Sequence, residues 1–203
     1  MVRVKICGIT DLDTALFAAE AGVDALGFVF APGHRRIEAE PARQICAALP
    51  PFVTRVGVFV DTPLLEVIKL VDYCALDAVQ LHGGEPPDYC RALGERVRVI
   101  KAFRVGGEGI PADMADYPVA AVLLDTLVPG RAGGTGQTFD WHLIRNAAIK
   151  APLILAGGLT PENVGRAVAL VKPWAVDVSS GVETEGRKDR NKIARLIRQV
   201  KNL

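Results

Sequence analysis

The stretch Val2-Arg3-Val4-Lys5-Ile6-Cys7-Gly8 sets the pattern on which the fold prediction rests. A short apolar run ends in a cysteine, and the glycine that follows it frees the backbone to turn. Further apolar runs of strand length follow along the chain: Ala25–Phe30, Val56–Val60, Ala78–Leu81, Val97–Phe103, Val119–Leu124, Leu153–Ala156 and Ala175–Val178. Most of these runs are continuous rather than alternating, which is typical of buried parallel strands.

Helical patterns separate these runs. They cover Asp13–Ala21, Pro41–Leu49, Leu64–Cys74, Pro87–Leu93, Trp141–Ile149, Glu162–Val171 and Asp189–Val200, with a weaker pattern over Ile110–Tyr117. Thr62-Pro63 and Thr160-Pro161 each offer an N-cap acceptor before a proline at the first helical position. Strands alternating with helices predict an α/β fold, a single (β/α)8 TIM-barrel domain over residues 1–203. An open doubly wound sheet is the alternative, but Gly8-Ile9-Thr10 does not match its nucleotide-binding glycine spacing.

Composition limits the class of protein further. The 203 residues are 50% hydrophobic, and the formal net charge of +1 argues against nucleic acid or membrane bound by charge alone. No run approaches the length of a membrane span, and the chain starts directly with a strand pattern. We therefore expect no signal peptide and a cytoplasmic location. Cys46, Cys74 and Cys90 fall in helical patterns and are expected to be buried and unpaired.

In such a barrel the carboxyl ends of the strands gather on one rim, where active sites of this fold lie. Polar residues and glycines are crowded at those ends: Cys7-Gly8, His34-Arg35-Arg36, Asp61, Gln80–Gly83, Lys101, Asp125-Thr126, Ala156–Gly158 and Asp177–Gly181. The loops with Gly157-Gly158 and with Ser179-Ser180-Gly181 follow the last two strands, where barrels frequently bind phosphate. The alternative is that these glycines only form tight turns.

Two rim residues are candidates for acid–base chemistry. Asp125 ends an apolar run, so partial desolvation would raise its pKa, as a general acid requires; a structural cap or an ion pair is the alternative. Cys7 would need a lowered pKa to act as a base, and Lys5, on the same strand face, could supply that shift. We favour an ion pair between Lys5 and Asp177 that fills the barrel, because a buried lysine needs a partner. An inert buried thiol is the alternative for Cys7.

Three further features lie near this rim. An arginine of His34-Arg35-Arg36 could hold a carboxylate in a fork, whereas a solvated basic loop is the interpretation that suits Arg35. His82 could contact a ligand or only bond a neighbouring loop. The glycine-rich stretch Pro129–Thr138 follows Asp125 and could be a lid or a passive connection, and it lacks a Walker motif.

In their order along the chain, these motifs resemble the phosphoribosylanthranilate isomerase family of tryptophan biosynthesis. The matching segments run from the first strand to the last: Lys5–Thr10, Gly27–Phe30, Gln80–Gly83, Leu124–Thr126, Gly133–Gly136, Thr138–Trp141, Ala156–Leu159 and Asp177–Glu183. The resemblance implies an Amadori rearrangement of the aminoaldose N-(5'-phosphoribosyl)anthranilate. The product is the aminoketose 1-(2-carboxyphenylamino)-1-deoxyribulose 5-phosphate.

The resemblance also implies roles for single residues. Asp125 is the general acid that protonates the furanose ring oxygen, Cys7 is the general base that removes the C2' proton, and Arg36 holds the anthranilate carboxylate. The remaining substrate-binding candidates are His82, Gly157, Gly158, Asp177, Ser179, Ser180 and Gly181. No cofactor or metal is expected. The expected partner is a small phosphosugar, with neither nucleic acid nor membrane, and the chain could be a monomer or a homodimer.

Two other functions stay open at this point. The phosphosugar isomerase of histidine biosynthesis performs the same type of reaction on a related barrel, but that family has an aspartate where Cys7 stands. A non-catalytic barrel that binds a phosphate ligand is the second alternative. Such a binder would have no need for both Cys7 and Asp125.

Overall fold

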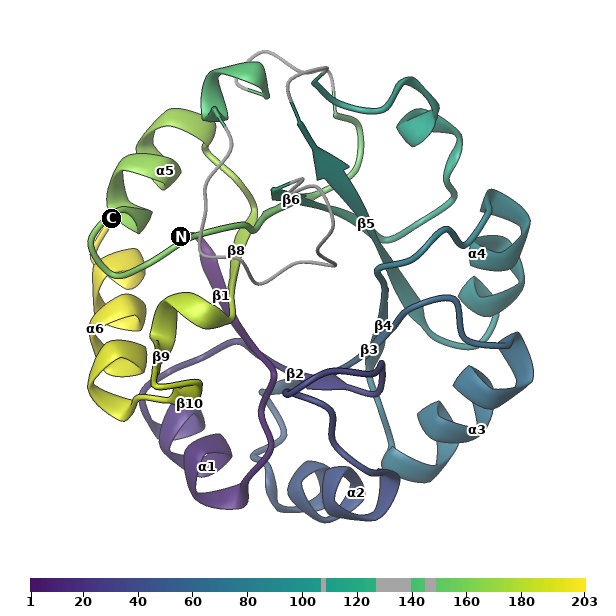
Figure 1. The fold of residues 1–203 in the computed structure, drawn as a ribbon, viewed down its shortest axis with the longest axis horizontal. Helices are drawn as coiled ribbons and strands as arrows, with labels where there is room; N and C mark the ends of the chain where they lie inside the picture. The colour runs from purple at the N-terminus through teal and green to yellow at the C-terminus, as the bar shows by residue number, and fades with distance from the viewer. Residues whose placement is uncertain (107–108, 127–139, 145–148) are drawn as a thin grey trace.

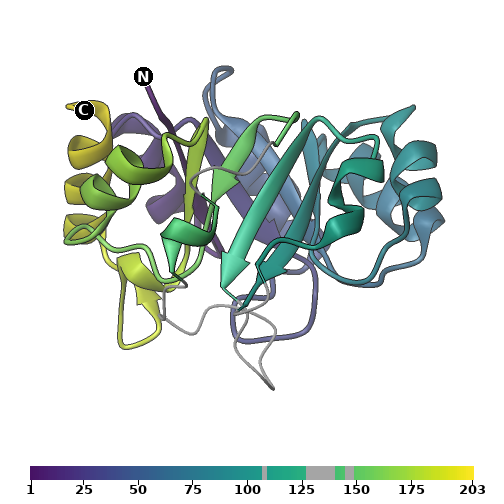
Figure 2. The same cartoon turned by 90° about the horizontal axis from the view of Figure 1, so that it is seen from above.

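The computed structural model describes residues 1–106, 109–126, 140–144 and 149–203. Parallel strands close into a barrel in the order of the sequence, with helices around it (Figures 1 and 2). The strands are β1 (Arg3–Cys7), β2 (Ala25–Val29), β3 (Thr54–Phe59), β4 (Ala78–Leu81), β5 (Arg98–Val105), β6 (Ala121–Thr126), β7 (Leu153–Leu155) and β8 (Ala175–Val178). Pairing of Lys5 with Asp177 in the register of β1 and β8 completes the ring. The predicted TIM barrel is confirmed, and the open sheet is excluded.

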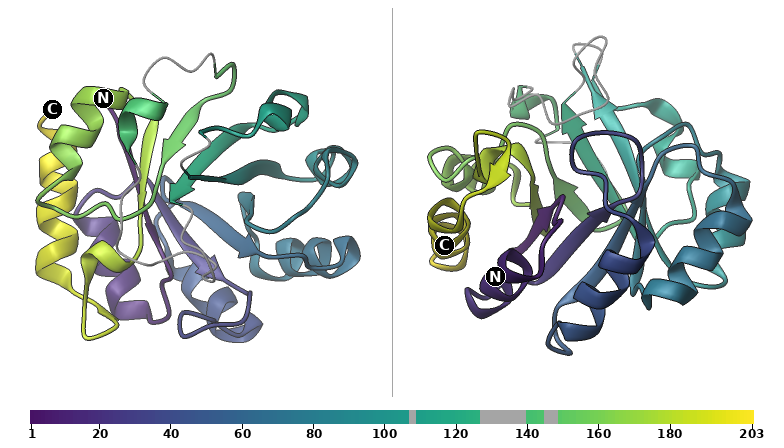
Figure 3. Two further views of the ribbon diagram at one scale, coloured as in Figure 1. Left: turned by 45° about the horizontal axis from the view of Figure 1, so that its top comes forward. Right: turned by 60° about the horizontal axis from the view of Figure 1, so that its bottom comes forward.

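Helices cover the outside of the barrel, and the two chain ends lie near each other (Figure 3). The helices are α1 (Leu12–Glu20), α2 (Ala39–Ala48), α3 (Leu64–Cys74), α4 (Pro87–Gly94), α5 (Val164–Val171) and α6 (Arg190–Lys201). Between β8 and α6 lie the short 3-10 helix η3 (Ser180–Val182) and the hairpin of β9 (Glu183–Thr184) and β10 (Arg187–Lys188). No helix within the described residues is long and apolar enough to cross a membrane.

Two predicted α-helices take another form. The Ile110–Tyr117 pattern is the 3-10 helix η1 (Ala112–Asp116), none of whose residues is buried. A segment without a buried face lacks the tertiary packing that stabilises most α-helices. The Trp141–Ile149 pattern begins as the 3-10 helix η2 (Trp141–Leu143), and residues 145–148 lie outside the described part of the chain.

The predicted threonine N-caps are wrong. Helix α3 has Pro63 at its N-cap without a side-chain bond, and the Thr62 hydroxyl donates instead to the Val60 carbonyl at 3.3 Å. Thr160 accepts a hydrogen bond from the Glu162 N–H at 3.2 Å, but in a turn that precedes α5. Both hydroxyls bond to backbone groups of local turns, and threonine side chains readily make such bonds in place of capping a helix.

The barrel interior changes from apolar to polar along the strands. An inner cluster of small and branched side chains fills its lower part: Val56, Ala78, Ile100, Ala102, Ala121, Leu123, Ile154, Ala156 and Ala175. On a strand, positions two apart share a face, so Ala175 is followed inward by Asp177, and Leu123 by Asp125. This spacing places the polar residues above the apolar filling, at the carboxyl ends. A second cluster packs the strands against the helices and includes Cys46, Cys74 and Cys90, which are buried and unpaired as predicted.

Candidate active site

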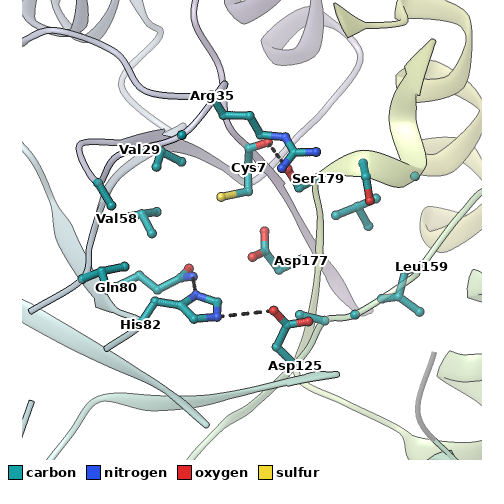
Figure 4. Close-up of a pocket in the computed structure, with 18 of the residues that line it drawn as sticks. Cys7, Val29, Arg35, Val58, Gln80, His82, Asp125, Leu159, Asp177 and Ser179 are labelled. Carbon is teal, nitrogen blue, oxygen red and sulfur yellow. Dashed lines mark hydrogen bonds and ion pairs between the residues drawn. The ribbon is translucent and has the colours of Figure 1, made fainter. Parts of the chain in front are cut away.

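A cavity of about 250 Å³ opens at the carboxyl ends of the strands. It is lined by most of the predicted site residues: Cys7, His82, Asp125, Gly157, Gly158, Asp177, Ser179, Ser180 and Gly181. Figure 4 shows the Cys7 sulfur pointing into this space, with His82 and Asp125 on another side. Of the predicted residues, Arg36 does not line the cavity.

Cys7 ends β1 and is only 8% exposed. The Lys5 ammonium, next to it on the same face, donates to the Asp177 carboxylate at 2.9 Å, so the favoured ion pair inside the barrel is confirmed. A Cβ on Gly27 would lie 2.9 Å from Cys7 Sγ and 3.0 Å from Lys5 Nζ, so both side chains occupy the space that this glycine leaves. Burial raises the pKa of the Cys7 thiol, and the opposing charge of Lys5 does not offset it.

Asp125 lies in the cavity wall at the end of β6 and is 7% exposed. Its Oδ1 accepts a hydrogen bond from the Thr126 N–H at 2.8 Å, and its Oδ2 lies 3.3 Å from His82 Nε2. Gly157 packs directly against it: a Cβ there would collide with Thr126 and lie 2.9 Å from Asp125 Oδ1. Gly157 also has a φ of +85°, a backbone conformation that residues other than glycine rarely adopt. The carboxylate is therefore held on two sides, with one edge facing the cavity.

Gln80 is a site residue to which the sequence assigned no role. It is 1% exposed, lies on the inner face of β4, and its Nε2 is 3.0 Å from His82 Nδ1. When the Gln80 amide donates to Nδ1, the ring proton stands on Nε2, which faces Asp125. Gln80 thereby orients His82 toward the carboxylate. The sequence signal was the spacing of two, which places Gln80 and His82 on one face of the strand.

The loops after β7 and β8 pack against each other beside Cys7. A Cβ on Gly181 would overlap the Leu159 carbonyl, so a side chain at this position would push the loops apart. The Ser179 hydroxyl donates to the Cys7 carbonyl at 3.1 Å, which fixes the second loop to the end of β1. Gly181 therefore does more than form a turn, because it sets the distance between two loops that line the cavity.

The two arginines after β2 lie opposite to the expectation from the sequence: Arg35 faces the cavity and Arg36 faces solvent. Arg36 is half exposed, and its Nη2 lies 3.3 Å from Glu38, outside the cavity. Arg35, expected to be solvated, lines the cavity and donates from Nε and Nη2 to both carboxylate oxygens of Glu183 at 2.8 Å. This bidentate bond raises the pKa of the Arg35 guanidinium and lowers that of Glu183, whose burial works in the opposite direction.

Other rim residues serve the scaffold. Lys101 turns away from the cavity and donates to Glu85 at 3.0 Å and to the Gly83 carbonyl at 2.7 Å. Within the described ranges, no three His, Cys, Asp or Glu side chains are grouped to hold a metal ion. The glycine-rich stretch Pro129–Thr138, for which a lid and a passive connection were both open, lies outside the described residues.

Comparison with known proteins points to one family. The family model for N-(5'phosphoribosyl)anthranilate (PRA) isomerase matches residues 4–199. A relative named N-(5'-phosphoribosyl)anthranilate isomerase, from Desulforamulus reducens, is 53% identical over 203 residues, which cover 100% of this chain and 97% of the relative. The crystal structure of phosphoribosyl anthranilate isomerase from Thermotoga maritima is 48% identical, with a TM-score of 0.90 and 100% coverage of both chains. A structure of such an enzyme with reduced 1-(o-carboxyphenylamino)-1-deoxyribulose 5-phosphate is 47% identical, with a TM-score of 0.85 and the same coverage.

Proposed function

The chain belongs to the N-(5'-phosphoribosyl)anthranilate isomerase family, and we propose that Cys7 and Asp125 are the base and the acid of its reaction. The enzyme converts the aminoaldose N-(5'-phosphoribosyl)anthranilate to the aminoketose 1-(2-carboxyphenylamino)-1-deoxyribulose 5-phosphate, a step of tryptophan biosynthesis. The observation that carries the proposal is that a thiol on β1 and a carboxylate on β6 line the same cavity. A barrel that only bound a phosphate ligand would not need this pair.

Asp125 acts first in this mechanism. It donates a proton to the furanose ring oxygen, the C1'–O bond breaks, and the anthranilate nitrogen lone pair completes a protonated Schiff base. The Thr126 N–H bonds one oxygen of the Asp125 carboxyl group, and the His82 ring lies 3.3 Å from the other. Orientation by fixed neighbours lets the acid meet the ring oxygen without a rearrangement of its own.

Cys7 acts second. It removes the proton from C2', and the electrons of the C–H bond neutralise the Schiff base to give an enolamine, which tautomerises to the ketone. A proton on carbon next to a protonated imine is acidic enough to be removed by a thiolate. Because burial raises the pKa of Cys7, the positive charges around it decide how much thiolate is available.

The substrate's anionic groups have separate places. We assign the phosphate to the loops with Gly157, Gly158 and the Ser179–Gly181 segment, whose backbone N–H groups and Ser180 hydroxyl are the donors that suit an anion. Arg36 is assigned to the anthranilate carboxylate, which it would reach by turning from Glu38 toward the cavity mouth. The bound phosphosugar in the related enzyme supports a ligand of this chemistry.

The test separates turnover from binding. Turnover is followed by the loss of anthranilate fluorescence as the substrate is consumed, and binding by calorimetry with the reduced product analogue. Cys7→Ala and Asp125→Asn should each abolish turnover and still bind the analogue. Full activity in either variant would disprove that residue's role. Loss of analogue binding in both variants would show that the substitutions disturb the binding loops, and the loss of turnover would then not be evidence for the acid–base pair.

A further inference from the structure

We propose that Lys188 is a positioning residue that stabilises the Cys7 thiolate, because it adds one positive charge more than its ion-pair cluster neutralises. The inference rests on the proposed role of Cys7 as the base. Lys188 belongs to the β9–β10 hairpin, which follows η3 and leads into α6 (Figure 1). Its turn residues Glu185 and Gly186 have φ of 53° and 77°, the geometry of a tight hairpin turn that returns the chain toward the barrel.

Hydrogen bonds through Ser179 link Lys188 to the backbone of Cys7. The Lys188 side chain is 4% exposed, and its Nζ donates to the Glu183 carboxylate at 2.6 Å and to the Ser179 carbonyl at 3.0 Å. The Ser179 hydroxyl in turn donates to the Cys7 carbonyl at 3.1 Å. Arg35 already bonds both oxygens of the same carboxylate at 2.8 Å. Glu183 therefore pairs with two cations, the buried Lys188 and the partly buried Arg35, through a single negative charge.

The charges around the thiol do not balance. They come from five parts of the fold: Lys5 on β1, Arg35 after β2, Asp177 on β8, Glu183 on β9 and Lys188 on β10. Three cations and two carboxylates leave a surplus of one positive charge. Across the cavity, His82 and Asp125 face each other rather than this cluster.

The surplus charge is a feature that packing alone does not explain. Burial lowers the pKa of Lys188, so keeping its charge is unfavourable unless an anion is near. Its interaction with a Cys7 thiolate raises the pKa of the lysine and lowers the pKa of the thiol. In a water-poor site such an interaction is much stronger than it would be at the surface. A Cys7 thiolate, once formed, supplies the counter-charge that this cluster lacks.

The experiment measures the Cys7 pKa in the intact protein, from the pH dependence of iodoacetamide alkylation with the modified cysteine identified by mass spectrometry. Lys188→Met keeps the length of the side chain and removes the charge, and we expect the Cys7 pKa to rise by about one unit, a tenfold loss of thiolate at neutral pH. Glu183→Gln enlarges the positive surplus, so the Cys7 pKa should fall. Lys188→Arg keeps the positive charge, so the Cys7 pKa should stay at its wild-type value.

Lys192→Met is the matched control. Its Nζ donates to the backbone carbonyl of the same Glu183 at 2.7 Å, whereas Arg35 and Lys188 pair with the Glu183 carboxylate, so we expect its removal to leave the Cys7 pKa unchanged. The limb of the kcat/KM profile that reports Cys7 should move with the alkylation pKa in every variant.

Two results would overturn the inference: an unchanged Cys7 pKa in Lys188→Met, or shifts of the same sign in Lys188→Met and Glu183→Gln, which would indicate a disturbed loop. Because alkylation does not require turnover, either result is distinct from the failure of Cys7 as the base, which only Cys7→Ala reveals.

Discussion

The ion pair between Lys5 and Asp177 offers the sharpest test of how the barrel interior is held together. The two side chains are 4% and 8% exposed, and Nζ and Oδ1 lie 2.9 Å apart. Removing one partner leaves the other charge unpaired in a space that water barely reaches. Loss of a single member of a buried pair destabilises proteins by about 3–5 kcal/mol, much more than loss of a surface pair.

We therefore expect Lys5→Met to reduce the free energy of unfolding by about 3–5 kcal/mol at neutral pH. Removing both charges in Lys5→Met/Asp177→Asn should be less harmful than the sum of the two single changes, by about 2 kcal/mol, because no charge is left unpaired. Urea unfolding followed by far-UV circular dichroism gives the midpoint and the slope for each of the variants.

A surface pair of the same geometry serves as the control. Arg195 Nη1 lies 2.8 Å from Glu162 Oε1, but the two side chains are 56% and 62% exposed. Arg195→Met should change the free energy of unfolding by no more than about 1 kcal/mol. If Lys5→Met lowered the free energy of unfolding as little as Arg195→Met, or if the effect of the double variant equalled the sum of the two single effects, Lys5 and Asp177 would not form a coupled, buried ion pair.

Three further predictions concern the cavity. Gly157→Ala should lower kcat at least tenfold while circular dichroism stays native, since the new Cβ strains the φ of +85° and displaces Asp125; a native kcat would contradict this packing. Gln80→Leu should lower kcat and change the tautomer of His82 seen by ¹⁵N NMR, and an unchanged tautomer would remove the orienting role of Gln80. Arg36→Ala should raise KM with little change in kcat, the signature of lost ground-state binding, and an unchanged KM would assign the carboxylate to another residue.

The fold was predictable because its signal is local and repeated. Each apolar run was predicted to be a strand and forms one. The observed bounds differ from the predicted ones by two residues or fewer: the run Val97–Phe103, for example, is the strand β5 over Arg98–Val105. Helices α3 and α4 followed from equally strong patterns. Two kinds of prediction failed: the α-helices over Ile110–Tyr117 and Trp141–Ile149, and the threonine caps, since the Thr62 hydroxyl bonds the Val60 carbonyl instead.

The site was predictable where a residue's position on its strand decides which way it points. Cys7 and Asp125 end strands on the inner face, so the barrel brings them to one cavity. Arg35 and Arg36 show the limit of such reasoning, because both are arginines in a loop and only the folded loop directs one of them to Glu183. Lys188 was missed for a related reason: its place depends on a hairpin turn and on long-range partners.

The charge on Cys7 also bears on the order of the two proton transfers. In the free protein burial raises the pKa of the thiol, so the base is held mostly in its neutral form and is less reactive toward electrophiles. Once Asp125 has opened the ring, the protonated Schiff base places a new positive charge in the cavity, and a positive charge nearby favours a thiolate. The acid's step thus increases the share of Cys7 that is present as thiolate. Lys188 limits how far burial can raise the thiol pKa beforehand, so that the charge on the substrate needs to supply only the remainder.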